Sequence, residues 1–296
     1  MKTFSILDFE ARFPDDDTCL DWLLKARWPD GVNCGKCAKV TSHYRLTGRP
    51  AYTCGVCGSH TYPMSGSIFQ DSRTPLRLWF KAVAMMAVTR CGISSRQLSR
   101  DLGVTVKTGY RMWFQIRQIL IENTGTLLGV VEADETYVGG AAKNKHANKR
   151  DGKRGRGASG KTIVMGMVER KGKVVAMVVP DVSRVSILPK IQAQVAPQTT
   201  IYTDELPTYA PLARMGYQHG TVNHLAKVYV TGGDIHVNTI EGFWSQLKRS
   251  IDGTYHHVTA RHLPDYVNEY AFRYNHRGDE TPMFWTMLNQ VVKHSS

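Results

Sequence analysis

The chain has 296 residues, carries a formal net charge of +13 and is 42% hydrophobic, which supports a buried core in one large domain or several smaller ones. Its first residues include acids where a secretory signal would be apolar, no apolar run approaches the roughly 18 residues of a membrane span, and six cysteines are too few for a disulfide scaffold. These properties exclude secreted, membrane-spanning and disulfide-rich classes, and the positive charge predicts a cytoplasmic protein with a polyanionic partner, DNA or RNA.

Residues 1–30 have the pattern of a helical segment. Apolar positions recur at helical spacing, Leu20, Leu23 and Leu24 among them, and a Pro-Asp-Gly sequence at 29–31 ends the run. We therefore expect a helical N-terminal segment. It is net acidic, so the excess positive charge of the chain lies elsewhere.

Four cysteines within residues 31–65 are spaced like metal ligands. Cys34 and Cys37 form one CxxC pair, Cys54 and Cys57 form a second, and 16 residues separate the two pairs. A two-residue spacing lets both sulfurs reach one ion, and four sulfurs fill a tetrahedral shell. The pattern predicts one structural zinc ion in a zinc ribbon. Buried free cysteines and a redox CxxC are the alternatives, although redox motifs seldom occur twice at this spacing.

Residues 72–122 have the pattern of consecutive helices. Ser94 can cap a short helix that ends at Gly103, and Thr105 can cap a longer second helix. This spacing is typical of a helix-turn-helix unit, and a plain helical linker is the alternative. The exposed residues expected to reach a DNA groove from the start of the second helix are Lys107, Thr108, Tyr110 and Arg111.

Residues 128–290 alternate strand-like and helical runs, which predicts an α/β domain with a mixed sheet flanked by helices. In the helix expected around residue 245, Ile240, Phe243 and Trp244 begin an apolar stripe at helical spacing. The expected elements are a strand within 129–140, a hairpin over 161–180 that turns at Lys171 and Gly172, a helix over 184–195, a strand over 199–204 and a helix from about 237 to 251.

Three acids fall on these expected elements. Asp134 lies on the first strand, Asp204 ends the later strand, and Glu241 lies on the helix that follows. Carboxylates on neighbouring strands can bind two divalent cations, Mg²⁺ or Mn²⁺, about 4 Å apart, and Glu241 can complete the ligand set. Lys248, two turns after Glu241, can hold a phosphate. The alternative is that each acid belongs to the solvated surface, as single acids commonly do.

These residues lie within longer, specific strings of sequence. The strings are RWPDG at 27–31, GSIFQDSRTPL at 66–76, DETYVGG at 134–140, YTD at 202–204, HVNTIEGFW at 236–244, YHH at 255–257 and FRYNHR at 272–277. At these residues the sequence resembles the DDE transposases of bacterial insertion sequences, in the ISXO-like class with an N-terminal zinc ribbon. The resemblance covers nearly the whole chain.

The resemblance implies an RNase H-like catalytic fold, divalent metal and strand transfer of element ends. It implies that Asp134, Asp204 and Glu241 take the triad positions, and that Lys248 takes the basic position seven residues after the last acid. Some relatives place an asparagine in the third metal position, and Asn238 lies one helical turn before Glu241. Other acids are close in sequence: Glu132 shares the strand face of Asp134 and can assist or replace it, whereas Glu135 and Glu205 face the other way by period-two alternation.

A basic segment holds about half of the excess positive charge. Residues 141–161 contain eight Lys or Arg residues, one acid and four glycines, which predicts a loop that binds DNA near the metals. A loop that only improves solubility is the alternative. The residues expected to contact phosphates are Lys149, Arg150, Lys153, Arg154 and Arg156.

The function predicted from these features is a transposase that nicks element ends by hydrolysis and joins the 3′-hydroxyl to target DNA. Its expected partner is double-stranded DNA, on which it acts as a homodimer or larger assembly in the bacterial nucleoid, with no membrane involved. One alternative is a zinc-dependent DNA-binding regulator with an inactive RNase H-like domain. Another is an RNase H-like nuclease that does not transfer strands.

Overall fold

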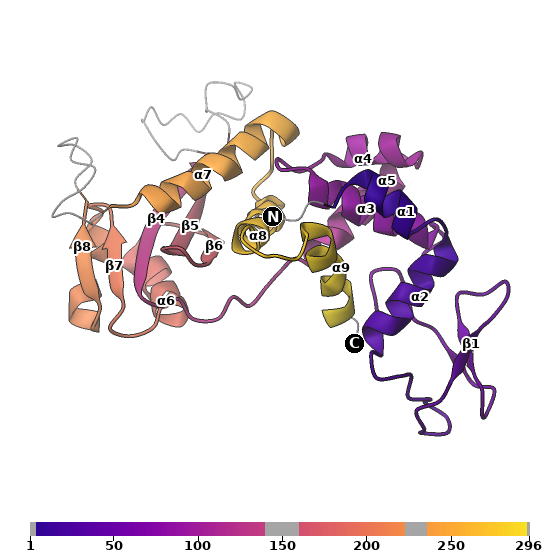
Figure 1. The fold of residues 1–296 in the computed structure, drawn as a ribbon. Helices are drawn as coiled ribbons and strands as arrows, with labels where there is room; N and C mark the ends of the chain where they lie inside the picture. The colour runs from indigo at the N-terminus through magenta and orange to yellow at the C-terminus, as the bar shows by residue number, and fades with distance from the viewer. Residues whose placement is uncertain (1–3, 140–159, 223–235, 295–296) are drawn as a thin grey trace. The chain divides into compact units, whose positions relative to one another are not determined.

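The structure, a computed structural model, describes residues 4–139, 160–222 and 236–294 (Figure 1). Its contacts divide the chain into two compact units. One unit combines residues 1–120 with 278–296, and the other consists of residues 121–277. Among the described residues, no helix is both long enough and apolar enough to cross a membrane.

Two capped helices open the first unit. α1 (Ile6–Arg12) begins with a capping box at Ser5, in which side chain and backbone satisfy each other's hydrogen bonds. α2 (Asp16–Arg27) follows directly, and the carboxylate of Asp15 accepts a hydrogen bond from an amide of its first turn. The helical pattern at the start of the sequence thus corresponds to two short helices.

A small antiparallel sheet follows, in the order β1-β2-β3. Its strands are β1 (His43–Arg45), β2 (Tyr52–Cys54) and β3 (His60–Thr61). Polar contacts attach this sheet to α2. Arg45 Nη2 lies 2.6 Å from Asp17 Oδ1, and the hydroxyl of Tyr52 donates to the carboxylate of Asp21. A sheet this short buries little apolar surface by itself, and these polar contacts help to hold it against α2.

Three helices continue the first unit: α3 (Leu76–Val88), α4 (Ser95–Leu102) and α5 (Val106–Gln118). Ser94 caps α4 and Thr105 caps α5 through their side-chain hydroxyls. Gly103, between them, has a φ of 67°, a left-handed conformation that glycine adopts without strain. The predicted short helix, glycine turn and second helix are confirmed, while DNA binding by this pair stays a prediction.

The last helix of the chain, α9 (Met283–Lys293), completes the core of the first unit. It packs against α2 and α3. The ring centroid of Phe284 lies 6.1 Å from those of Phe9 and Phe13, and Phe13 lies 5.1 Å from Phe80. The sequence assigns most of this helix to the long segment that begins at residue 128, and no local pattern predicts its packing with the first unit.

The second unit is built on a mixed sheet in the order β6-β5-β4-β7-β8. β4 pairs antiparallel with β5 on one side and parallel with β7 on the other. The predicted hairpin is confirmed as β5 and β6, with Lys171 at its turn in a positive-φ conformation. The strands are β4 (Val130–Val138), β5 (Thr162–Glu169), β6 (Val174–Val179), β7 (Thr200–Thr203) and β8 (Gln218–Thr221).

Helices cover both faces of this sheet (Figure 1). Val131 and Ala133 of β4 pack in one apolar cluster with Ile187 of α6, whereas Asp134 and its neighbour across the ladder, Gly166, face α7. The helices are α6 (Arg184–Gln194), α7 (Asn238–Ser250) and α8 (Leu263–Asn275), with short helical turns η3 (Pro207–Tyr209), η4 (Leu212–Met215) and η5 (Ile251–Tyr255). The predicted strands and the helices α6 and α7 are confirmed, whereas β8 and α8 were not predicted.

Candidate functional site

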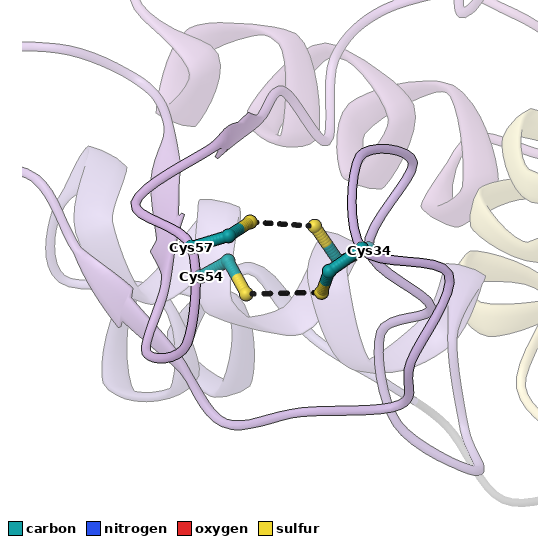
Figure 2. A group of neighbouring side chains, drawn as sticks. Cys34, Cys54 and Cys57 are labelled. Carbon is teal, nitrogen blue, oxygen red and sulfur yellow. Dashed lines mark hydrogen bonds between the residues drawn. The ribbon is translucent and has the colours of Figure 1, made fainter.

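The four cysteines of the first unit converge on one point. Cys34 Sγ lies 3.4 Å from Cys57 Sγ, Cys37 Sγ lies 3.9 Å from Cys54 Sγ, and the four atoms all lie within 4.8 Å of one another. Figure 2 shows Cys54, at the end of β2, and Cys57, in the turn that follows, facing Cys34. Sulfurs arranged tetrahedrally at about 2.3 Å from a zinc ion lie about 3.8 Å apart. The observed separations therefore fit one zinc ion.

Hydrogen bonds favour the thiolate form at two of these cysteines. The hydroxyl of Thr41 lies 3.1 Å from Cys54 Sγ, and together with backbone amides of its own CxxC turn it lowers the pKa of Cys54 to about 5. Backbone amides of the other turn lower the pKa of Cys34. The thiolate is the form that binds zinc, so these hydrogen bonds favour metal binding at one cysteine of each turn. Burial raises the pKa of Cys37 to about 11, and burial together with the neighbouring thiols outweighs a backbone hydrogen bond and raises the pKa of Cys57.

Asp134 and Asp204 meet at one end of the large sheet. In the parallel register of β4 and β7, Glu132 lies beside Tyr202, so the two aspartates occupy equivalent positions two residues further along. Carboxylate oxygens of Asp134, Glu135 and Asp204 all lie within 4.8 Å of one another. The structure thus brings together two of the three predicted triad acids and adds Glu135. Among the described residues, Glu241 is not part of this group of oxygens.

The electrostatics of this cluster favour a bound cation. Burial raises the pKa of Asp134 to about 6, and the negative charges of Asp204 and Glu241 act in the same direction. Burial also raises the pKa of Glu135 to about 7, against a hydrogen bond from Tyr209 that lowers it. Adjacent carboxylates that repel one another offer the oxygen ligands that hard divalent cations prefer. The donor set therefore fits Mg²⁺ or Mn²⁺.

Glu135 reaches the cluster from the opposite face of the sheet. It shares the side of β4 that carries Val131 and Ala133, and the Tyr209 hydroxyl donates to its Oε1 at 2.6 Å. Period-two alternation predicts the direction in which the Cβ of Glu135 points. It does not show that the long side chain can bring its carboxylate to Asp204, just beyond the end of β7. The DET sequence at 134–136 is the one signal that places a second acid beside Asp134.

α7 presents the remaining predicted residues on its exposed side. Ile240, Phe243, Trp244, Leu247 and Ile251 are all buried, as the apolar stripe predicted. Asn238, Glu241 and Lys248 are exposed and follow one side of the helix at intervals of three and seven residues. Glu241 lies near enough to Asp134 for its negative charge to make a small contribution, after burial and the charge of Asp204, to the raised pKa of that carboxyl group.

A glycine in β5 lets α7 lie close to the sheet. A Cβ added to Gly166 would come within 2.6 Å of the Trp244 ring and 2.9 Å of Ile240. The indole Nε1 of Trp244 donates to Asp134 Oδ2 at 3.0 Å. The same tryptophan therefore packs α7 on the sheet and orients a carboxylate of the acidic cluster.

Glu132 lies on the predicted face of β4, but its carboxylate contacts α7 and not the acidic cluster. It is fully buried, and both of its oxygens accept hydrogen bonds from the start of α7. Since those bonds occupy its oxygens, Glu132 is not available to replace Asp134 as a metal ligand. Sequence alternation gives its strand face correctly but does not show that a helix begins against it.

Only some of the residues predicted to bind DNA lie in the described part of the chain. Lys107, Tyr110 and Arg111 are exposed on α5, where Arg111 Nη2 donates to the hydroxyls of Ser72 and Thr74 at 3.1 and 3.2 Å, and Thr108 is half-buried. The basic residues Lys149, Arg150, Lys153, Arg154 and Arg156 lie outside the described part of the chain.

Comparison with known protein families assigns the two segments that carry the cysteine cluster and the carboxylate cluster. A family model described as the ISXO2-like transposase domain matches residues 126–275. The chain belongs to the ISXO2-like transposase family. A second model, the transposase zinc-ribbon domain, matches residues 14–60, which include all four clustered cysteines. The family match includes both aspartates, Glu135 and α7.

Individual relatives of this transposase agree with the family assignment. A protein described as an uncharacterized protein in transposable element ISH50, from Halobacterium salinarum, is 29% identical over 276 residues, 88% of this chain and 91% of that protein. An uncharacterized transposase-like protein from Haemophilus influenzae is 29% identical over 125 residues, 42% of this chain and 98% of that protein. A chain of the simian T-cell lymphotropic virus intasome has a TM-score of only 0.32 at 15% identity, covering 73% of this chain and 74% of its own, and that is too low to support a conclusion.

Proposed function

We propose that this transposase cuts and joins DNA at the acidic cluster of its second unit. The observation that carries the proposal is the convergence of Asp134, Glu135 and Asp204, with oxygens within 4.8 Å of one another beside the exposed side of α7. When bound there, two divalent ions would activate the attacking oxygen and stabilise the leaving oxygen of a phosphodiester. We assign the third ligand to Glu241, with Asn238 and Glu135 as the alternatives.

The residues of the site then have separate tasks. Asp134 is oriented by Trp244, and Asp204 Oδ1 accepts a hydrogen bond from the backbone amide of Leu206 at 3.0 Å, so these two carboxylates would hold the divalent ions. Lys248 extends from the same side of α7 as Glu241 and binds a phosphate of the DNA as a point charge. No side chain has to attack phosphorus, because water or a 3′-hydroxyl is the nucleophile.

The remaining parts of the chain bind DNA in this proposal. The mixed sheet with helices on both faces supports an RNase H-like catalytic fold. The ribbon, with one zinc ion on its four cysteines, and the α4–α5 pair together recognise the element ends. The α4–α5 pair acts as a helix-turn-helix unit. The residues of α5 that contact the DNA groove are Lys107, Thr108, Tyr110 and Arg111. We expect two or more copies of the chain on each pair of ends, since both ends of one element have to be cut and joined to the same target DNA.

The direct test uses purified full-length protein and linear DNA that carries the ends of its own element. Nicking at the ends and joined products are expected with Mg²⁺ or Mn²⁺ and are expected to disappear with a chelator. Nicking without joining would indicate a nuclease, and DNA binding without either reaction would indicate a regulator. An unrelated DNA of equal length and base composition is the matched substrate control.

Neutralising five basic residues of the segment 141–161 is expected to weaken DNA binding without changing sequence preference. Each phosphate contact that is lost should reduce the slope of log affinity against log salt by about 0.9. The measurement is a salt titration of binding to end DNA and to unrelated DNA. A salt slope equal to that of the unchanged protein would assign this segment to solubility alone. The five residues are Lys149, Arg150, Lys153, Arg154 and Arg156.

A further inference from the structure

The start of α7 obtains its cap from a distant strand. The residue before the helix, Val237, has no side chain that can accept a hydrogen bond, although the first amides of any helix need acceptors. Glu132 of β4 supplies them. Its Oε2 accepts the amide of Thr239 at 2.8 Å and the amide of Ile240 at 3.0 Å. A carboxylate at this end of a helix also interacts favourably with the helix dipole.

The other oxygen of Glu132 extends this contact into the sheet. Oε1 accepts from the hydroxyl of Thr239 at 2.9 Å and from Arg170 Nε at 2.8 Å. Arg170 Nη2 donates to the carbonyl of His236 at 2.8 Å, and its guanidinium lies 4.8 Å from the ring centroid of Tyr202. Glu132 has no exposed surface, and charged hydrogen bonds in such a place are among the strongest in proteins.

These contacts hold α7 against β4 at two points on either side of Glu241. Glu132 binds the amide of Ile240, the residue just before Glu241, and Asp134 accepts a hydrogen bond from Trp244, three residues after it. We propose that Glu132 is a positioning residue that fixes Glu241 beside Asp134 and so sets the affinity of the acidic cluster for divalent cations. Glu132 can affect cation binding in this way only when Glu241 is a metal ligand, so this role rests on the proposed function.

The test replaces the charge and keeps the shape. Glu132→Gln in the full-length protein replaces one carboxylate oxygen, a hydrogen-bond acceptor, with an NH₂ group. That group would face the N–H and O–H donors that now bind Glu132, so the cap of α7 weakens. The expected result is a dissociation constant for Mn²⁺, measured by calorimetry, that rises about tenfold, with the amides of Thr239 and Ile240 exchanging hydrogen about tenfold faster. Asp134→Asn identifies the part of the Mn²⁺ binding that belongs to the cluster.

A thermodynamic cycle separates positioning from general loss of stability. If Glu132 acts through Glu241, Glu132→Gln should change Mn²⁺ affinity little in a protein that already carries Glu241→Gln. Glu269→Gln is the matched control. Glu269 is also fully buried and bound to an arginine, with Arg273 Nη2 at 2.8 Å from its Oε1, but it lies on α8. It should leave Mn²⁺ affinity unchanged even if it lowers the melting temperature.

Two results would overturn the role of Glu132: unchanged Mn²⁺ affinity in Glu132→Gln, or an equally large effect in the Glu241→Gln background. If the wild-type protein binds no Mn²⁺ that Asp134→Asn removes, the proposed function fails instead. Thr239→Val provides a milder variant in case Glu132→Gln does not fold. It removes only the hydroxyl donor to Glu132, and a smaller shift in the same direction is expected, whereas no shift contradicts the proposal.

Discussion

Replacing Asp134 or Asp204 with asparagine is expected to reduce both nicking and joining of element ends by on the order of a thousandfold or more. The amide keeps the shape of the side chain but removes a negative charge from the cluster, and cation binding contributes several kcal/mol of transition-state stabilisation. Binding of end DNA should remain intact, since the zinc ribbon and α4–α5 lie in the other unit. Gel assays of nicked and joined products, with binding measured in parallel, check both parts.

The neighbouring residue Glu205 offers a matched control for these changes. It is exposed and directly follows Asp204, so Glu205→Gln makes the same chemical change outside the cluster and should leave activity unchanged. Normal activity in both aspartate variants would remove the proposed catalytic centre and favour a DNA-binding regulator.

The same assay distinguishes the candidates for the third ligand. Glu241→Gln should cost nearly as much as the aspartate changes, Asn238→Ala should cost less, and Lys248→Ala should be milder because the cations stay in place. Full activity of Glu241→Gln with Mg²⁺ would assign the third position elsewhere. A severe loss of activity in Asn238→Ala would then identify Asn238 as the third ligand. A severe loss of activity in Glu135→Gln would identify Glu135, which reaches the cluster from the other face of the sheet.

Replacing any of the four clustered cysteines with serine is expected to release the zinc ion and unfold the ribbon. Structural zinc contributes about 10 kcal/mol or more of folding free energy to small metal-binding units, and the three short strands here bury little else. End binding should weaken strongly, while residues 121–277 stay folded. Zinc content per chain should fall from about one to zero, and limited proteolysis should cut within residues 31–65.

Cys91→Ser is the appropriate control, because Cys91 is exposed and lies outside the cysteine cluster. It should retain zinc and end binding. A Cys34→Ser protein that keeps a full equivalent of zinc would show that other residues hold the ion.

Local patterns in the sequence were enough to predict most of the elements that carry the two candidate sites. The CxxC spacing is a short-range property, so the convergence of Cys34 with Cys57 follows from two turns and one small sheet. The stripe that begins at Ile240 likewise determines which side of α7 is buried, because helical periodicity applies wherever the helix packs. Glu241 on the exposed side of this helix follows from the same periodicity.

Contacts between distant segments could not be predicted in this way. The periodicity of β4 gives the face of Glu132, but only the packed structure shows that α7 begins there and uses its carboxylate as a cap. The same periodicity turns Glu135 away from Asp134, yet its side chain reaches the other carboxylates at the end of the sheet. Both cases depend on which helix or strand ends lie next to each other in the folded protein, and the spacing of residues along the sequence does not predict this.

The packing of α9 in the first unit has a consequence for synthesis of the protein. Phe284 contributes to the aromatic core that includes Phe9 and Phe13, so that core is incomplete until nearly the whole chain has left the ribosome. At about 5–20 residues per second, residues 121–277 emerge over roughly ten to thirty seconds before α9 does. During that interval a nascent chain can fold its sheet of five strands, while the aromatic core next to its first helices still lacks one side. The first unit can therefore complete its aromatic core only after the residues of the second unit have been synthesised.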